Sequence, residues 1–199
     1  PDSRAAVNAW APEAMTCGWP TDFTDWNQAG IVIAVGPGLG TQTLVEAIAP
    51  LNTAQIWDAD ALNQLSRHGP ELLKSSALRI LTPHPGEAAR LLACTTQDIQ
   101  TNRAQSCLAI AQRYQTLCVL KGQDTLISDG ERLAHCPYGN PGMASGGMGD
   151  VLTGILAALL GQGMDAWDAA CLGVCLHAKA GDRAAQAKGE MSLLARDLI

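Results

Sequence analysis

Aromatic residues and basic charge are both scarce in this sequence. Its 199 residues include one Phe, two Tyr and five Trp, but 20 Gly and 10 Pro. Many tight loops are therefore expected, around a core built mainly from Ala, Leu and Val. Lys and Arg together number 13 against 19 Asp and Glu, so the formal net charge is −6. This charge gives no basic surface for nucleic acid, and no nucleic-acid partner is expected.

Long apolar runs and a disulfide framework are also missing. The segment 151–160 is too short to cross a bilayer and contains Gly154, so no membrane contact is expected. The seven cysteines are an odd number and form no C-x-x-C motif. We interpret them as buried free thiols in a reducing compartment, rather than as disulfides or zinc ligands, and expect a cytoplasmic protein.

The sequence does contain alternating apolar strands and amphipathic helices. Strands are expected at 31–35, 55–58, 78–82 and 117–121, a hairpin over 125–134, and helices at 41–49, 87–92, 101–114, 151–161 and 167–187. A short helix is expected after Pro70, and an amphipathic piece over 193–199. Residues 1–30 are expected to be irregular apart from a short helical turn, and the strand 31–35 to be buried on both faces. This alternation predicts an α/β fold of one domain, with a mainly parallel sheet covered by helices on both faces.

The loop 139–150 is too rich in glycine to be regular, and it runs directly into the apolar helix that follows. The amides of Gly146, Gly147 and Gly149, here called the anion nest, lack intrahelical partners at that helix start, where the helix dipole adds positive potential. Such a site suits a phosphate or a developing oxyanion. Asp150 on its rim is interpreted either as a general base or as an ordinary first-turn acid.

A second glycine loop, Gly36-Pro37-Gly38-Leu39-Gly40, follows the first expected strand. With Asp58 about 20 residues further on, it resembles a dinucleotide-binding fingerprint. Gly40 is one position early for G-x-G-x-x-G, and Pro37 removes an amide that could face a phosphate. Three interpretations stay open: a loop that faces substrate or phosphate, a plain tight turn, or a Rossmann cofactor site.

Polar side chains follow the other strands. Asp58 and Asp60 are candidates for binding magnesium through water or for capping the next helix. His84, fixed between two prolines, is expected to contact a ligand, the alternative being a structural role. Lys121 is either a snorkelling end residue or a phosphate contact. Because ligands of open α/β sheets bind beyond the carboxyl ends of the strands, these motifs are expected to form one site.

Other residues offer less. No G-x-x-x-x-G-K-[ST] motif occurs, which excludes P-loop chemistry. No second His or Cys stands at ligand spacing from His84, so zinc is not expected. Glu87 is a candidate first-turn helix acid, a packing role is expected for His177, and a structural role for Asp182.

Taken together, these motifs resemble the ADP/ATP-dependent NAD(P)H-hydrate dehydratase family, a branch of the ribokinase-like three-layer α/β/α fold. The matching segments are Gly36–Gly40, Asp58-Ala59-Asp60-Ala61-Leu62, Thr82-Pro83-His84-Pro85-Gly86-Glu87, Lys121-Gly122-Gln123-Asp124-Thr125, and Gly139 through Gly154. They cover about residues 31–198 in the family's order. Each is weak alone, but His-Pro-Gly-Glu with Gly-Gly-x-Gly-Asp-Val-Leu separates this branch from sugar and vitamin kinases of the same fold.

The resemblance implies a repair reaction. The 6-hydroxyl of the S-form of NADH or NADPH hydrate would be phosphorylated by ADP or ATP, with Mg²⁺ expected, and loss of phosphate would restore NAD(P)H. Asp150 would be the catalytic base, and Gly38, Gly40, His84 and Asp150 would contact the substrate. The nucleotide would be held by Lys121, Gly122, Gln123, Asp124, Thr125, Asn140, Gly142, Ser145, Gly146, Gly147, Met148 and Gly149. The metal ligands are not identified, and a homo-oligomer is expected.

The family pattern also includes an N-terminal strand–loop–helix segment that this chain lacks, so an exposed sheet edge is expected. Larger bacterial relatives carry an epimerase domain upstream, which is possible in the full-length protein. Two alternative functions follow from the same motifs: a ribokinase-like kinase of a vitamin precursor, and a non-catalytic nucleotide-binding remnant.

Overall fold

The computed structural model describes residues 4–18, 22–42 and 44–199. The chain forms a six-stranded sheet in which the strands lie side by side in sequence order, from β1 to β6. The strands are β1 (Val32–Val35), β2 (Ala54–Trp57), β3 (Arg79–Leu81), β4 (Leu117–Leu120), β5 (Thr125–Ser128) and β6 (Leu133–Cys136). The first four are parallel, and β5 and β6 form the expected antiparallel hairpin.

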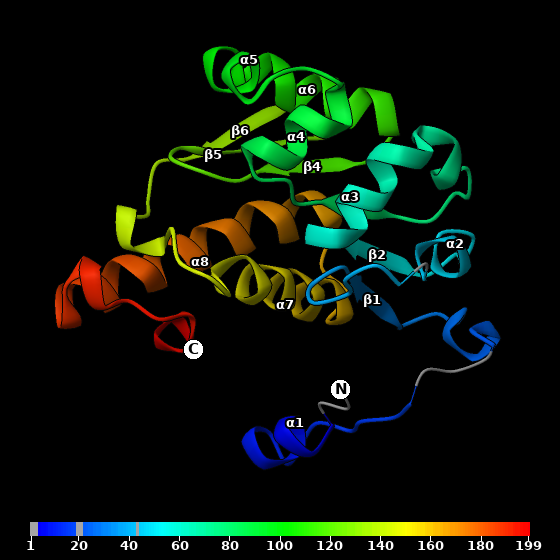
Figure 1. Ribbon diagram of the computed structural model, residues 1–199, viewed down its shortest axis with the longest axis horizontal. Coiled ribbons are helices and arrows are strands. Elements are labelled where there is room, and N and C mark those ends of the chain that lie inside the picture. The colour runs from blue at the N-terminus through cyan, green and yellow to red at the C-terminus, as the bar shows by residue number, and fades with distance from the viewer. Residues whose placement is uncertain (1–3, 19–21, 43) are drawn as a thin grey trace.

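Helices cover both faces of this sheet (Figure 1). One face carries α2 (Val45–Ile48), α3 (Ala59–His68), α4 (Pro85–Leu92), α5 (Thr96–Thr101) and α6 (Arg103–Tyr114). The other carries α7 (Met148–Gly161) and α8 (Ala166–Lys188). Short 3-10 turns occur at Thr24–Trp26, Pro70–Leu73, Pro141–Met143, Glu190–Ser192 and Ala195–Leu198. The prediction of a three-layer α/β/α fold with a mainly parallel sheet is confirmed.

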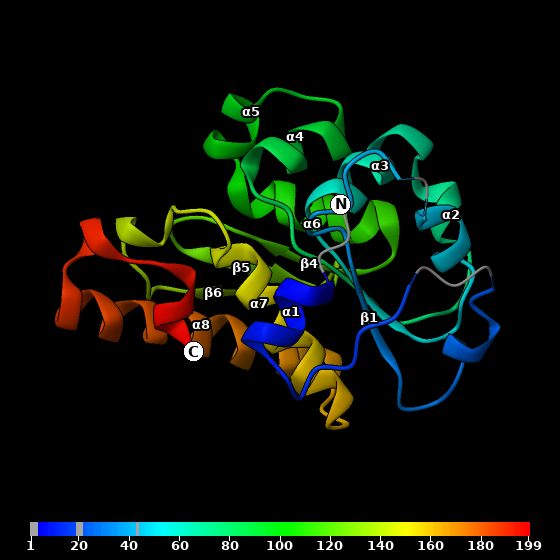
Figure 2. The ribbon, with the colours of Figure 1, turned by 60° about the horizontal axis from the view of Figure 1, so that its bottom comes forward.

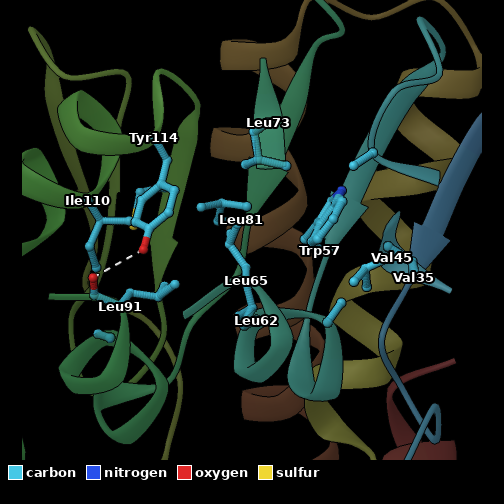
Figure 3. Close-up of a cluster of buried hydrophobic side chains, with 14 of the residues drawn as sticks. Val35, Val45, Trp57, Leu62, Leu65, Leu73, Leu81, Leu91, Ile110 and Tyr114 are labelled. Carbon is cyan, nitrogen blue, oxygen red and sulfur yellow. Dashed lines mark hydrogen bonds between the residues drawn. The ribbon is translucent and has the colours of Figure 1, made fainter. Parts of the chain in front are cut away.

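The side chains of the central strands alternate between two apolar clusters. Trp57 and Leu81 face α3, α4 and α6, where Tyr114 donates its hydroxyl hydrogen to the carbonyl of Leu91 at 3.1 Å (Figure 3). Ile56 and Ile80, their neighbours in sequence, face α7 and α8 instead. Period-two alternation with both faces covered gives fully buried strands, which hold the strand ends rigidly in place.

The edge strand β1 departs from the prediction. Ala34 is exposed on it, so the expectation of burial on both faces is wrong for β1, whereas every residue of β3 and β4 is buried. Among the described strands, β1 pairs with β2 alone, so it forms one edge of the sheet. The N-terminal helix α1 (Arg4–Trp10) buries none of its residues and stands apart from the sheet in Figure 1.

Several boundaries differ from the sequence prediction. The helix expected at 41–49 is confined to Val45–Ile48, since turns occupy Pro37, Gly38, Gly40 and Thr41. α5 was not predicted, and α7 begins at Met148 instead of residue 151. All seven cysteines are free, but Cys17 and Cys94 are exposed, so burial was wrongly predicted for those two. Trp19, one of three tryptophans in the N-terminal segment, lies outside the described residues.

The C-terminal segment lies beside the loop that precedes α7 (Figure 2). Leu193 and Leu198 are buried against Met148 at the start of α7. A Cβ on Gly142 would lie 2.3 Å from the carbonyl oxygen of Glu190, so only glycine fits there. In the described part of the chain, no helix is long and apolar enough to span a membrane.

Candidate functional site

The ends of β2 and β4 are joined by a buried ion pair. Lys121, which follows β4, donates from Nζ to Oδ1 of Asp58, which follows β2, at 2.6 Å. Asp58 is 1% exposed, and its Oδ2 accepts the hydroxyl hydrogen of Thr153 on α7 at 3.1 Å. One carboxylate therefore joins two strand ends to the helix that carries the predicted anion nest.

Two further residues extend this cluster. Glu87 is 5% exposed; its Oε2 lies 4.0 Å from Lys121 Nζ and accepts the backbone N–H of His84 at 2.8 Å. His84 Nδ1 in turn accepts the N–H of Gly86 at 3.0 Å and the N–H of Glu87 at 3.4 Å, and the bond from Glu87 completes a capping box at the start of α4. Nδ1 is thus an acceptor, and the ring proton is on Nε2, 3.3 Å from Glu87 Oε1. Half of the His84 side chain is exposed, so it is accessible to a ligand while its backbone is fixed.

The loop after β1 is held by Asp60, the second of the two aspartates that follow β2. Asp60 Oδ2 accepts the N–H of Gly40 at 2.8 Å. Gly36 has φ +125°, and a Cβ there would lie 1.7 Å from the carbonyl oxygen of Asp58. Asp58 makes no side-chain cap to α3, so the capping interpretation is wrong for Asp58, and its carboxylate serves Lys121 and Thr153 instead. Among the described residues, no group of three or more His, Cys, Asp or Glu side chains is arranged to hold a metal ion.

The start of α7 has the geometry of an anion site. Gly147 takes φ +86° at the N-cap, and a Cβ on Gly146 would meet no heavy atom within 4 Å. The first amides of such a helix have no intrahelical partner and lie at the positive end of its dipole. Asp150 is exposed in the first turn.

A pocket of about 540 Å³ opens beside this helix start. Eight of the predicted nucleotide residues line it: Lys121, Gly122, Gln123, Asp124, Thr125, Asn140, Met148 and Gly149. Gly142, Ser145, Gly146 and Gly147 do not line it, nor do the predicted substrate residues Gly38, Gly40, His84 and Asp150. A pocket of this size accommodates a small organic ligand, with glycines where backbone must approach closely.

The opposite wall of the pocket comes from α8. Asp182 accepts the N–H of Gly139 at 3.0 Å and Nδ2 of Asn140 at 2.9 Å, so it has the structural role expected of it. His177, expected only to pack, lines the pocket and is 2.9 Å from the carbonyl oxygen of Met148 through Nε2. Because a carbonyl can only accept, Nε2 carries the proton. Burial lowers the pKa of His177, and the nearby charge of Lys121 lowers it further, although the bond to Met148 opposes both.

Comparison with known proteins agrees with this arrangement. The profile of the NAD(P)H-hydrate dehydratase family matches residues 1–199. The chain belongs to this family. The bifunctional NAD(P)H-hydrate repair enzyme of Vibrio cholerae is 44% identical over 208 residues, which is 100% of this chain and 41% of that protein. The chain thus spans about two fifths of the length of this curated relative.

Solved structures of the dehydratase family share the fold. The ADP/ATP-dependent NAD(P)H-hydrate dehydratase of Bacillus subtilis, co-crystallised with ATP and Mg²⁺ and soaked with CoA, superposes with a TM-score of 0.84. It is 30% identical, over 98% of this chain and 73% of that one. A ribokinase-like superfamily protein of Enterococcus faecalis superposes at 0.77 with 27% identity, over 98% and 69% of the two chains. The fold is therefore ribokinase-like.

The sequence did not predict the contacts that three residues make at this candidate site. Thr153 was read only as part of an apolar helix, and its bond to Asp58 joins positions 95 residues apart. His177 was assigned to packing because its helix is apolar. Glu87 is a first-turn helix acid, as predicted. The spacing His-x-x-Glu is that of a capping box with histidine in place of serine or threonine, and it could have shown the bond of Glu87 to His84.

Proposed function

We propose that this chain catalyses the nucleotide-dependent dehydration of the S-form of NADH or NADPH hydrate. The observation that carries the proposal is the pocket bounded by Lys121–Thr125 and by Met148 and Gly149 of α7. Asp150, which is exposed, follows Gly149 in the first turn of α7. A phosphate donor in the pocket and a carboxylate one residue beyond its lining are what phosphorylation of a hydroxyl requires.

The donor is ADP or ATP, with ADP favoured. The pocket fits a nucleotide, because glycine backbone and the start of α7 offer amides to phosphate oxygens. Mg²⁺ would supply charge neutralisation between phosphate oxygens, in keeping with the ATP and Mg²⁺ of the Bacillus subtilis crystals. Since the described residues contain no metal-binding cluster, we assign no protein ligand to the metal.

The residues divide the work as follows. Asp150 accepts the proton of the 6-hydroxyl. The hydroxyl oxygen of the substrate then forms a bond to the terminal phosphorus of the nucleotide, and the anhydride bond to that phosphorus breaks. Amides of the anion nest stabilise the charge on the transferring group. The C6–O bond then breaks, phosphate leaves and C5 loses a proton, which restores the dihydropyridine ring. His84, Gly38 and Gly40 contact the substrate, His84 offering its Nε2–H as a donor.

The test is to incubate the chain with NADH hydrate and ADP or ATP and follow the recovery of absorbance at 340 nm. Asp150→Asn should lower kcat by about 10²- to 10⁴-fold, the range for loss of a general base, while ADP still binds. Asp168→Asn is the matched control, because Asp168 is also an exposed acid in the first turn of a helix, α8. Its turnover should match that of the wild type.

Other outcomes would contradict the proposal. Equal turnover by Asp150→Asn and wild type would exclude Asp150 as the base. Phosphorylation of a vitamin precursor without recovery of NADH would favour the kinase, and ADP binding without any turnover would favour the remnant. A homo-oligomer, an upstream epimerase domain and a cytoplasmic location stay predictions; light scattering of the purified chain tests the first.

A further inference from the structure

We propose that Asp58 is a positioning residue for this reaction. It acts by holding the first turns of α7, and with them Asp150 and the anion nest, against the ends of β2 and β4. Its kinetic readout rests on the proposed dehydratase function, but its structural readout does not.

The contacts of the Asp58 carboxylate carry the argument. Oδ1 accepts from Lys121 at 2.6 Å and Oδ2 from Thr153 at 3.1 Å, so both oxygens are used. The carboxylate is 2% exposed and Thr153 also 2%, which excludes solvent from both bonds. Charge-assisted bonds of this kind are about twice as strong as neutral ones. Asp58 therefore fixes α7 to two strands that are remote from it in sequence.

The pair also lies directly under the catalytic turn. A Cβ on Gly149 would be 3.2 Å from Lys121 Nζ and 3.5 Å from Asp58 Oδ2. Gly149 precedes Asp150 on α7, and Thr153 lies one helical turn beyond Gly149. The ion pair of Asp58 and Lys121 therefore lies against α7 both before and after Asp150. A small rotation of α7 about its axis would move the carboxylate of Asp150 away from the acceptor hydroxyl.

Charge balance explains why Lys121 is committed to this role. Two carboxylates with little exposure, Asp58 and Glu87, lie within 4.0 Å of a single ammonium that is 19% exposed. Leaving a buried carboxylate without a partner is strongly destabilising, so Lys121 stays with Asp58. Lys121 lines the nucleotide pocket, but its ammonium is used to hold α7 in place.

The test uses two variants that each remove one of these bonds. Asp58→Asn keeps the size of the side chain and an acceptor for Thr153, but removes the charge that holds Lys121. Thr153→Val keeps the volume and removes the hydroxyl. Ser128→Ala is the control, since Ser128 is fully buried and its hydroxyl makes two hydrogen bonds, to Arg132 and Gly130, in the β5–β6 hairpin.

Two measurements separate positioning from simple stabilisation. Asp58→Asn and Thr153→Val should lower kcat by about 10- to 100-fold, as loss of a supporting hydrogen bond does elsewhere, with little change in the KM for ADP. Hydrogen exchange at the amides of Val151 to Gly154 should become faster in both variants. Ser128→Ala should lower the melting temperature without either effect. Because both bonds end on one carboxylate, the double variant should lose less than the product of the two single losses.

The proposal is overturned if both variants lower the melting temperature but keep kcat and the exchange rates of α7. If the wild-type chain shows no turnover, the dehydratase proposal fails, and exchange at α7 still decides whether Asp58 positions this helix.

Discussion

The anion nest makes a sharp prediction at Gly146. A Cβ at this position meets no heavy atom within 4 Å, and its φ is not in the left-handed region, so alanine fits without clash or backbone strain. Replacing such a glycine stabilises a protein by about 0.4–1 kcal/mol, because the unfolded chain loses freedom. Gly146→Ala should therefore raise the melting temperature by about 1–4 °C.

The kcat of Gly146→Ala should fall, although its stability rises. The added methyl group would stand where a phosphoryl oxygen approaches the amides at the start of α7. The amide donor remains but is blocked, and loss of one donor to a developing oxyanion costs about 10²–10³ in kcat, or about 2.7–4 kcal/mol, so a loss of up to this size is expected. The variant should thus be more stable than the wild type and much less active, which separates it from mutations that act by unfolding.

Gly154→Ala is the matched control. Gly154 lies on the same helix and is exposed, and a Cβ added to it would also meet no heavy atom within 4 Å. Alanine there should stabilise the helix by about 0.5–1 kcal/mol and leave turnover unchanged. Melting curves and recovery of 340-nm absorbance with ADP and NADH hydrate measure both quantities. If Gly146→Ala keeps wild-type kcat, no phosphoryl oxygen passes close to residue 146, and the anion nest is wrongly placed.

The remaining predictions concern stability. Gly36→Ala should lower the free energy of unfolding, measured by urea titration, by at least about 2 kcal/mol, because the added Cβ would collide with the carbonyl of Asp58. Gly30→Ala is the control: Gly30 also has a positive φ, but a Cβ there meets open space, so this variant measures the cost of the backbone conformation alone. Equal losses in the two would show that the contact with Asp58 relaxes freely. The pKa of His177 lies below its ordinary value of 6.5 in the folded state, so the unfolded state binds more protons and stability should fall as the pH drops through 6.5. His177→Gln should flatten this dependence between pH 7 and 5, and an unchanged slope would assign it to other groups.

The sequence predicted the order of strands and helices because each strand ends at a motif of glycine or charged residues. The start of α2 was predicted too early in the sequence, since the expected first residue, Thr41, belongs to the turn that Asp60 holds through its bond to Gly40. α5 is six residues long, too short for a periodic pattern, and is stabilised by a capping box at Thr95. Local patterns thus located elements well and their ends poorly.

The sequence predicted many of the residues of the candidate site, but not the hydrogen bonds between them. Placing Lys121 after a buried strand was enough to bring it to the pocket, because parallel strands end at one edge. The identity of its partner depends on a contact across 63 positions, which no local pattern encodes. The available signal was the opposite charge of Asp58 and Lys121 at the ends of two buried strands. Predicting that they pair would have required knowledge of the strand order.

The sequential order of the strands has a consequence for how the protein is made. In the part of the chain that the structure describes, the helices between β1 and β4 pack on one face, and the opposite face is covered by α7 and α8, from the last third of the chain. During synthesis the strand ends emerge first, and Asp58 has no bond to α7 until residue 153 has followed. Until then, the apolar face carrying Ile56 and Ile80 is uncovered. One side of the sheet therefore stays uncovered until α7 and α8 have been synthesised, and the candidate anion site at the start of α7 is completed after the strand ends.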